Sequence, residues 1–216
     1  MDISALTVRL GEYNCTNPTA IQNYKDFSAR RIIVHQNYMP LQSFKNPIAL
    51  IELDTPVSFT SHIRPICLPE SSVSYQNREA VLSGWVQTVR NSKSMNEVTV
   101  RNDRVEVVSN GLCDAHFLKL NRPMAIDESN LCAAQISSGM CAGDPGGALF
   151  VGRHGRAVLI GVYIGACVKS QDPIVLGIFA NVSSQMQWIR ENIERDEPSI
   201  DGIFNRLLHV FRYYFM

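Results

Sequence analysis

The chain has 216 residues and a mass of 24.2 kDa, which suits one large domain or two small ones. Hydrophobic residues make up 45% of it and charged residues 19%, a balance that excludes an intrinsically disordered protein. Lys and Arg number 20, as do Asp and Glu, so the excess positive charge of a nucleic-acid-binding protein is absent. No apolar run reaches the ~20 residues that span a bilayer, and the residues after Met1 show neither the basic nor the apolar region expected of a signal peptide.

Short apolar segments separated by Gly, Pro, Asn and Ser predict an all-β fold, either a barrel or a sandwich. Helical spacing occurs only late, from Met186 to Ile193, where Ser183 and Ser184 are candidate capping residues. In chain order, the predicted strands are Leu6–Leu10, Arg31–Val34, Ile48–Leu53, Ala80–Trp85, Val98–Val108, Ala148–Val151, Val158–Ile164 and Ile174–Phe179.

The C-terminal tail, residues 196–216, has its own pattern. Apolar residues are interspersed with Arg206, His209 and Arg212, and we expect the tail either to pack against exposed core or to be a non-native extension. A short amphipathic helix at a membrane surface is the alternative. The tail is too short to span a membrane.

The cysteines are far apart and include no C-x-x-C pair, which favours a secreted disulfide framework over a zinc site. The two glycosylation sequons, at Asn14 and Asn181, agree with a secreted origin. We therefore expect an extracellular protein with neither a cofactor nor a bound metal. The six cysteines are Cys15, Cys67, Cys113, Cys132, Cys141 and Cys167.

The segment M-C-A-G-D-P-G-G-A-L, residues 140–149, resembles the nucleophile loop of the trypsin/chymotrypsin family of serine proteases, C-x-G-D-S-G-G-P-L. Other family segments follow in the family's order, so the resemblance extends from Val8 to Ile193 and is strongest to the secreted arthropod branch. It implies a two-barrel domain over residues 1–195 whose N-terminal barrel lacks its opening strands. The segments are V-R-L-G-E at 8–12, H-Q-N-Y at 35–38, N-P-I-A-L at 46–50, I-R-P-I-C-L-P at 63–69, S-G-W at 83–85, N-L-C-A at 130–133 and the stretch 182–193 with Trp188.

The resemblance assigns the three catalytic roles to positions that cannot fill them. Pro145 stands where the family has the nucleophilic serine, and proline has neither a hydroxyl nor the backbone N–H that joins the one of Gly143 in the oxyanion hole. Pro47 stands where the family has the aspartate that orients the catalytic histidine. That histidine belongs to an A-A-H-C segment upstream of Val8, which this sequence does not contain. We therefore expect an inactive homologue.

The specificity pocket is also altered. Gly139 stands where a trypsin-like enzyme has the aspartate that binds a basic side chain, and the resemblance places Gly165 and Gly177 in the remnant of that pocket. Asp144 matches the family's aspartate that pairs with the new N-terminus after activation. None of these residues predicts capture of a basic substrate.

The resemblance also implies the disulfide pairing. Cys113 is expected to pair with Cys132, and Cys141 with Cys167, while Cys67 matches a cysteine that tethers the domain to an upstream segment. Cys15 has no counterpart in the family, so Cys15 and Cys67 are expected to be unpaired here, a bridge between them being the alternative. The family's calcium-binding loop lacks acidic residues here apart from Glu12 and Asp26, so no calcium site is expected.

The leading hypothesis is a catalytically inactive serine protease homologue that acts by binding a protein partner, either a protease or its substrate. Dead members of the family serve in protease cascades such as those of arthropod innate immunity, which is what the resemblance implies for this chain. Neither nucleic acid nor a membrane is an expected partner. The alternatives are a truncated gene product without function and an active endopeptidase with a different nucleophile.

Overall fold

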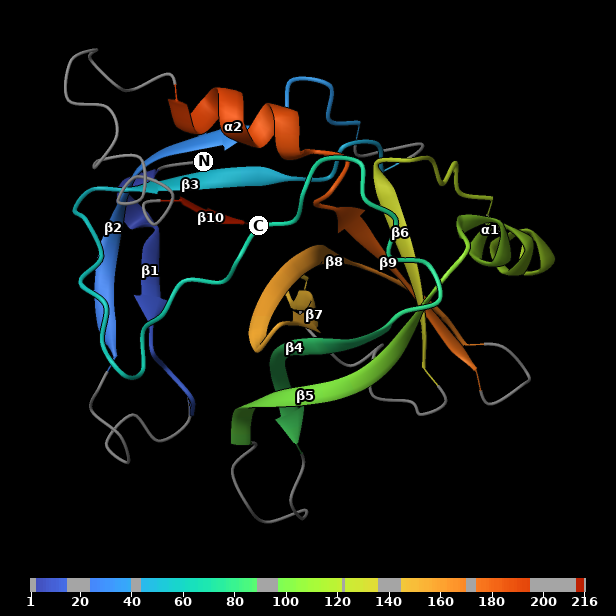
Figure 1. Ribbon diagram of the computed structural model, residues 1–216, viewed down its shortest axis with the longest axis horizontal. Helices are drawn as coiled ribbons and strands as arrows, with labels where there is room; N and C mark the ends of the chain where they lie inside the picture. Colours follow the sequence, from blue (N-terminus) through green and yellow to red (C-terminus); the bar gives the residue numbers. More distant parts are fainter. Residues whose placement is uncertain are drawn as a thin grey trace.

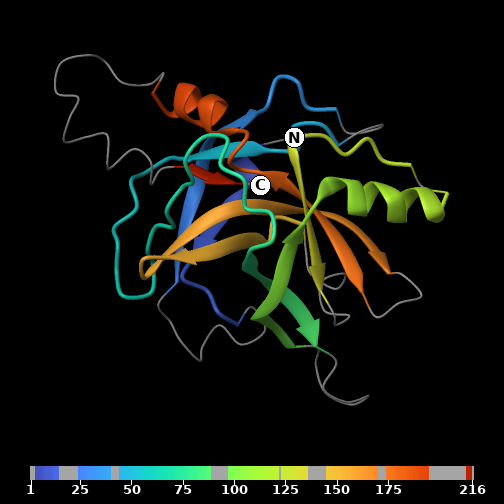
Figure 2. The ribbon, with the colours of Figure 1, turned by 45° about the vertical axis from the view of Figure 1, so that its right-hand side comes forward.

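The computed structural model describes residues 3–14, 24–39, 44–88, 97–121, 123–135, 145–169, 174–194 and 213–215. They form an open four-stranded sheet and, beside it, a closed six-stranded barrel (Figure 1). Figure 2, turned by 45°, shows the same arrangement, with helix α2 (Met186–Glu194) next to the open sheet. The predicted all-β, trypsin-like fold with a C-terminal helix is confirmed.

The open sheet has the strand order β1-β2-β3-β10. It begins after a short 3₁₀ turn, η1, and its strands pair antiparallel along the sheet. Glu52 of β3 is buried, and its carboxylate pairs with Arg30 at 3.2 Å and Arg31 at 3.1 Å on β2, which offsets the cost of removing that charge from water. The bounds are η1 Ile3–Ala5, β1 Thr7–Leu10, β2 Lys25–Val34, β3 Ala49–Leu53 and β10 Tyr213–Phe215.

Strand β10 comes from the C-terminal tail and lies against the edge of β3, with Tyr213 opposite Glu52 and Phe215 opposite Leu50. The alternative of an amphipathic helix is therefore wrong for these three residues, and the tail's residues 196–212 and 216 lie outside the described part. The physical reason is that a strand edge carries unpaired N–H and C=O groups, which a second strand satisfies and a helix does not.

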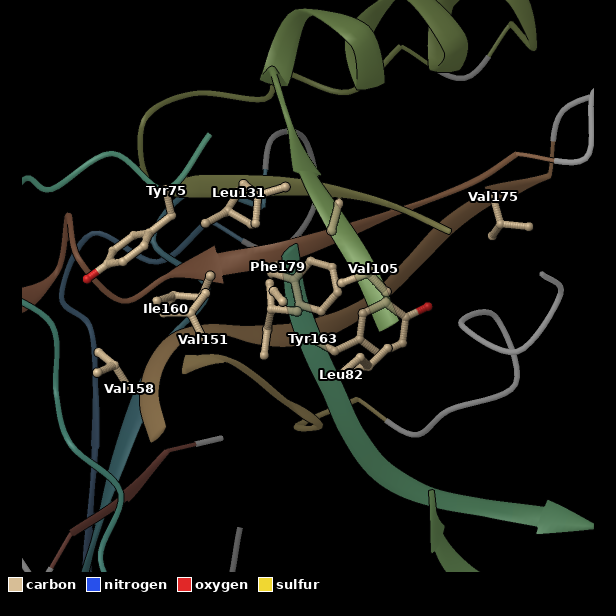
Figure 3. Packing of buried hydrophobic residues seen from close by; sticks show 14 residues of the cluster. Tyr75, Leu82, Val105, Leu131, Val151, Val158, Ile160, Tyr163, Val175 and Phe179 are labelled. Atoms are coloured by element: carbon tan, nitrogen blue, oxygen red, sulfur yellow. The ribbon is translucent and has the colours of Figure 1, made fainter. Parts of the chain in front are cut away.

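The barrel closes in the order β4-β5-β6-β9-β8-β7. Inward-facing residues of all its strands form one apolar core, and Figure 3 shows Leu82, Val105, Tyr163 and Phe179 of that core packed together. Closure leaves the barrel without exposed strand edges. The bounds are β4 Glu79–Thr88, β5 Glu97–Val108, β6 Asn130–Gln135, β7 Ala148–Arg153, β8 Arg156–Lys169 and β9 Val175–Asn181.

Helix α2 packs against both the open sheet and the barrel. Trp188 and Ile189 on its inner face belong to one core cluster with Leu50 of the sheet and Val162 of the barrel. The predicted helix is confirmed, but the predicted caps are wrong. The hydroxyl of Ser183 lies 3.0 Å from the carbonyl oxygens of both Glu70 and Val73, and it accepts the backbone N–H of Val73. The hydroxyl of Ser184 donates to the carbonyl oxygen of Asn181.

All eight predicted strands are present, whereas helix α1 (Asn110–Lys119) and strand β6 were not predicted. Helix α1 buries only Cys113 and Phe117 and carries Gly111 in its first turn, so its sequence lacks an apolar stripe. Strand β6 is buried on both faces except at Ala134, so its sequence lacks the alternation of polar and apolar residues that marks a half-buried strand.

Candidate functional site

A pocket of about 420 Å³ lies between the open sheet and the barrel, and we refer to it as the interface pocket. None of its described lining residues carries a charged side chain. The sheet side contributes Val34, Tyr38, Phe44, Pro47, Ile48 and Ala49, and the barrel side contributes Pro145, Gly146, Tyr163 and Ile164.

The interface pocket brings together Pro47 and Pro145, the two prolines that the sequence placed in catalytic positions. Pro47 comes just before β3, and Pro145 comes just before β7. Their pyrrolidine rings offer no nucleophile, no acid or base and no backbone N–H donor. The predicted neighbours Gly139, Gly143 and Asp144 lie outside the described residues.

The backbone after Pro145 pairs with strand β8. The N–H of Gly146 donates to the carbonyl oxygen of Tyr163 at 2.7 Å, and the N–H of Tyr163 donates to the carbonyl oxygen of Gly147 at 2.8 Å. Gly146 has φ of +97°, a conformation that favours glycine. These two hydrogen bonds hold Pro145 against β8.

Gly165, on β8, lies directly under the ring of Pro145. A Cβ atom at Gly165 would be 2.8 Å from the Cγ of Pro145, and φ of +82° at Gly165 also favours glycine. The pairing of β8 with β9 shifts register between Tyr163 and Ala166, which marks a bulge at this point. Gly177, the other predicted pocket glycine, lies in β9 opposite Cys167 and is not part of the interface pocket.

Asn46 fixes Pro47 on the other side of the pocket. Its φ is +48°, a left-handed conformation that asparagine tolerates better than most residues. Its N–H donates to the hydroxyl of Ser129 at 2.9 Å, and its Oδ1 accepts a hydrogen bond from the amide of Gln185, also at 2.9 Å. Ser129 and Gln185 were missed from the sequence, because only the folded chain brings the turn before β6 and the turn before α2 to Asn46.

Tyr163 also lines the pocket, and burial moves the pKa of its phenol further above neutral pH. The residue is buried, and its ring packs on Phe179 with centroids 5.4 Å apart (Figure 3). The hydroxyl therefore stays protonated at neutral pH. The described lining suits contact with apolar groups rather than acid–base chemistry.

Comparison with known proteins identifies the family. The Trypsin family model matches residues 2–189, nearly the whole chain. This chain belongs to the trypsin family. It is 29% identical over 191 residues to serine protease filzig of Drosophila melanogaster, an alignment that covers 87% of this chain and 11% of filzig.

Two further relatives of this trypsin-family chain are informative. It is 32% identical over 198 residues to CLIP domain-containing serine protease B4 of Anopheles gambiae, covering 86% of the chain and 54% of that protein. It is 28% identical over 199 residues to proclotting enzyme of Tachypleus tridentatus, an alignment that covers 89% of this chain and 51% of that protein. The chain thus spans between about a tenth and about half of the length of these relatives.

The cysteines of this family member are distributed as follows. A disulfide joins Cys113 of α1 to Cys132 of β6, the pairing that the resemblance implied. Cys167 is also disulfide-bonded, but Cys141, its predicted partner, lies outside the described residues, as does Cys15. Cys67 has a free thiol and is half-buried, so the described part agrees with an unpaired Cys67.

The two predicted glycosylation sites lie in different surroundings. Asn181 is half-buried, and its side-chain amide donates to the carbonyl oxygen of Glu128 at 3.0 Å. A glycan on this nitrogen would replace that hydrogen bond, and glycosylation at Asn181 stays a prediction. Asn14 is half-buried, and its backbone N–H donates to the carboxylate of Glu12 at 3.0 Å, so glycosylation there stays a prediction.

Within the described residues, neither a metal site nor a general base accompanies the interface pocket. His35 is buried, consistent with a structural role, and no described histidine lines this pocket. The described residues contain no cluster of three or more His, Cys, Asp or Glu side chains suited to a metal ion. Among those residues, no helix is long and apolar enough to cross a membrane.

Proposed function

We propose that this trypsin-family chain is a catalytically inactive homologue that acts by binding a protein. The observation that carries the proposal is that Pro47 and Pro145 line the same pocket. By the family resemblance, these are the positions of the catalytic acid and the nucleophile. Without a hydroxyl at 145, acyl transfer lacks its attacking atom.

The backbone at Pro145 also supports a loss of catalysis. Proline at 145 lacks the N–H that would stabilise an oxyanion, and losing a single such donor typically costs about 10²–10³ in rate. Removing a catalytic serine costs about 10⁶. The two losses coincide at one residue, so an endopeptidase activity would require a different nucleophile and a different base.

The binding part of the proposal rests on the rim of the interface pocket. Val34 and Tyr38 line the pocket and remain 52% and 40% exposed. Apolar and aromatic side chains around a concave site are typical of protein interfaces. The disulfides at Cys113–Cys132 and at Cys167 favour an extracellular setting. Because relatives include a proclotting enzyme and a CLIP-domain protease, we propose a component of a protease cascade as the partner.

An active-site probe tests the catalytic part. The purified chain is incubated with a fluorophosphonate that labels activated serines, with trypsin as the positive control. We expect no labelling of the chain. Labelling at one serine that disappears when this serine is changed to alanine would overturn the proposal in favour of an active endopeptidase.

A rate measurement tests the binding part. We expect the purified chain to change the rate at which an active cascade protease cleaves its protein substrate. The variant Val34→Glu/Tyr38→Glu should lose this effect, whereas Leu118→Glu, an exposed position on α1 outside the pocket, should retain it. An unchanged rate with every cascade protease tested would favour a gene product without function.

A further inference from the structure

A second cavity of about 390 Å³ lies where the start of helix α2 meets the turns before β3 and β6. It shares no lining residue with the interface pocket. Its described lining is polar and includes Asp127, Glu128 and Glu191, with Lys45 as the single cation. We refer to it as the acidic cavity.

The carboxylates of the acidic cavity are only partly neutralised. Lys45 lies 3.7 Å from Oδ2 of Asp127, and Oδ1 of Asp127 accepts hydrogen bonds from Ser129. Glu191 accepts one hydrogen bond, from the neutral amide of Gln187. Glu128 makes no ion pair with a described side chain. The cavity therefore carries a net negative charge that favours a cationic ligand.

Gln185 offers an oriented acceptor to the acidic cavity. The residue is only 5% exposed, and its amide nitrogen donates to Oδ1 of Asn46 at 2.9 Å and lies 3.4 Å from Oγ of Ser184, which fixes the orientation of the amide group. Gln185 lines the cavity, and its carbonyl oxygen Oε1 accepts no hydrogen bond from the described residues. An oxygen held in place without a donor is a ready acceptor for a ligand N–H.

His35 also lines the acidic cavity. It is 8% exposed, and its ring packs on Trp188 with centroids 4.8 Å apart. Its Nδ1 accepts the backbone N–H of Asn37 at 3.1 Å, so the neutral ring carries its proton on Nε2, which donates to no described residue. Burial lowers the pKa of His35, so the ring adds no positive charge to the cavity at neutral pH.

We propose that the acidic cavity binds an arginine side chain of a protein partner. The guanidinium donates to Oε1 of Gln185 and to the carboxylates of Glu128 and Glu191, and Nε2–H of His35 donates to a backbone carbonyl oxygen of the same partner. A guanidinium suits this lining because its fixed fork of N–H donors can reach several acceptors at once, whereas an ammonium is a point charge. The site is separate from the interface pocket and does not depend on the absence of catalysis.

The test uses the ¹⁵N-labelled chain and follows the indole N–H resonance of Trp188, assigned with Trp85→Phe. The probe is N-acetyl-arginine methylamide, for which we expect saturable shifts with a dissociation constant on the order of 1 mM. The citrulline analogue has nearly the same shape without the charge, and we expect it to bind at least about fivefold more weakly. Raising the salt concentration should weaken arginine binding as well.

Variants locate the site. Glu128→Gln/Glu191→Gln should weaken arginine binding at least about fivefold, and Glu106→Gln, an exposed carboxylate on β5, should leave it unchanged. Thermal melts of all variants verify folding, and these surface substitutions should not move the midpoint. Equal binding of citrulline and arginine, or no shift at Trp188 with either, would overturn the proposal. If the lysine analogue binds as tightly as the arginine analogue, the proposed preference for arginine is wrong, and the cavity binds basic side chains in general.

Discussion

The ring of Pro145 lies so close to Gly165 that a Cβ atom there would be 2.8 Å from Pro145 Cγ. The family resemblance predicts that Pro145 stands at the nucleophile position and that Gly165 belongs to the remnant of the specificity pocket. Their contact means that the proline occupies space next to the pocket remnant as well as removing the hydroxyl.

This contact predicts the effect of Gly165→Ala. The new methyl group would meet Pro145, and alanine is strained at φ of +82°, so we expect a loss of about 1–3 kcal/mol in the free energy of unfolding, measured by urea denaturation. Gly152→Ala on β7 is the matched control, because nothing lies within 4 Å of the position that its methyl group would take, and it should change stability by less than about 1 kcal/mol. Combining Gly165→Ala with Pro145→Ala should recover part of the loss, and equal losses in both backgrounds would argue against the contact.

Restoring the hydroxyl alone should not restore catalysis. In Pro145→Ser, the serine would face a pocket whose described lining contains no histidine and no carboxylate. We expect labelling by fluorophosphonate to stay at background, and the same for Pro47→Asp/Pro145→Ser, because the described lining supplies no histidine as a general base. Labelling of the introduced serine would show that a base reaches this site.

His35 should contribute a pH dependence to stability. Burial lowers its pKa in the folded chain below the ordinary value of 6.5, so the unfolded chain binds the proton more tightly. The contribution of His35 is fully present above pH ~6.5 and is lost as the pH falls from there through the folded-state pKa.

The variant His35→Gln isolates this contribution. The free energy of unfolding is measured between pH 5 and 7. Its slope against pH should be steeper for wild type than for His35→Gln, by at most ~1.4 kcal/mol per pH unit. His62→Gln, at an exposed position on the segment after β3, is measured in parallel. Identical slopes for wild type and His35→Gln would show that this ring does not titrate differently on folding.

The disulfide between Cys113 and Cys132 should stabilise the barrel. It closes a loop with a sequence separation of 19, so Cys113→Ala/Cys132→Ala should lower the free energy of unfolding by about 3 kcal/mol. Cys67→Ser changes a cysteine with a free thiol and serves as the control, for which we expect a change below about 1 kcal/mol. A loss in the double variant no larger than that in the control would contradict a stabilising role.

The sequence determined the fold class and the family, and its family resemblance predicts prolines at two catalytic positions. These depend on local patterns: alternating strands, the G-D-P-G-G loop at 143–147, and N-P-I-A-L at 46–50. Helix α1 and strand β6 were not predicted, because neither sequence has the apolar periodicity that indicates a half-buried element.

Only the tertiary structure decided which distant segments meet. It placed Pro47 and Pro145 in the lining of one pocket and paired the tail strand β10 with the edge of β3. It also brought Gln185 into the same cavity as His35, with no donor to Oε1 of Gln185 among the described residues. The physical reason is that strand-edge pairing, burial and hydrogen-bond satisfaction depend on neighbours that are far apart in the chain, and these neighbours exist only once the chain has folded.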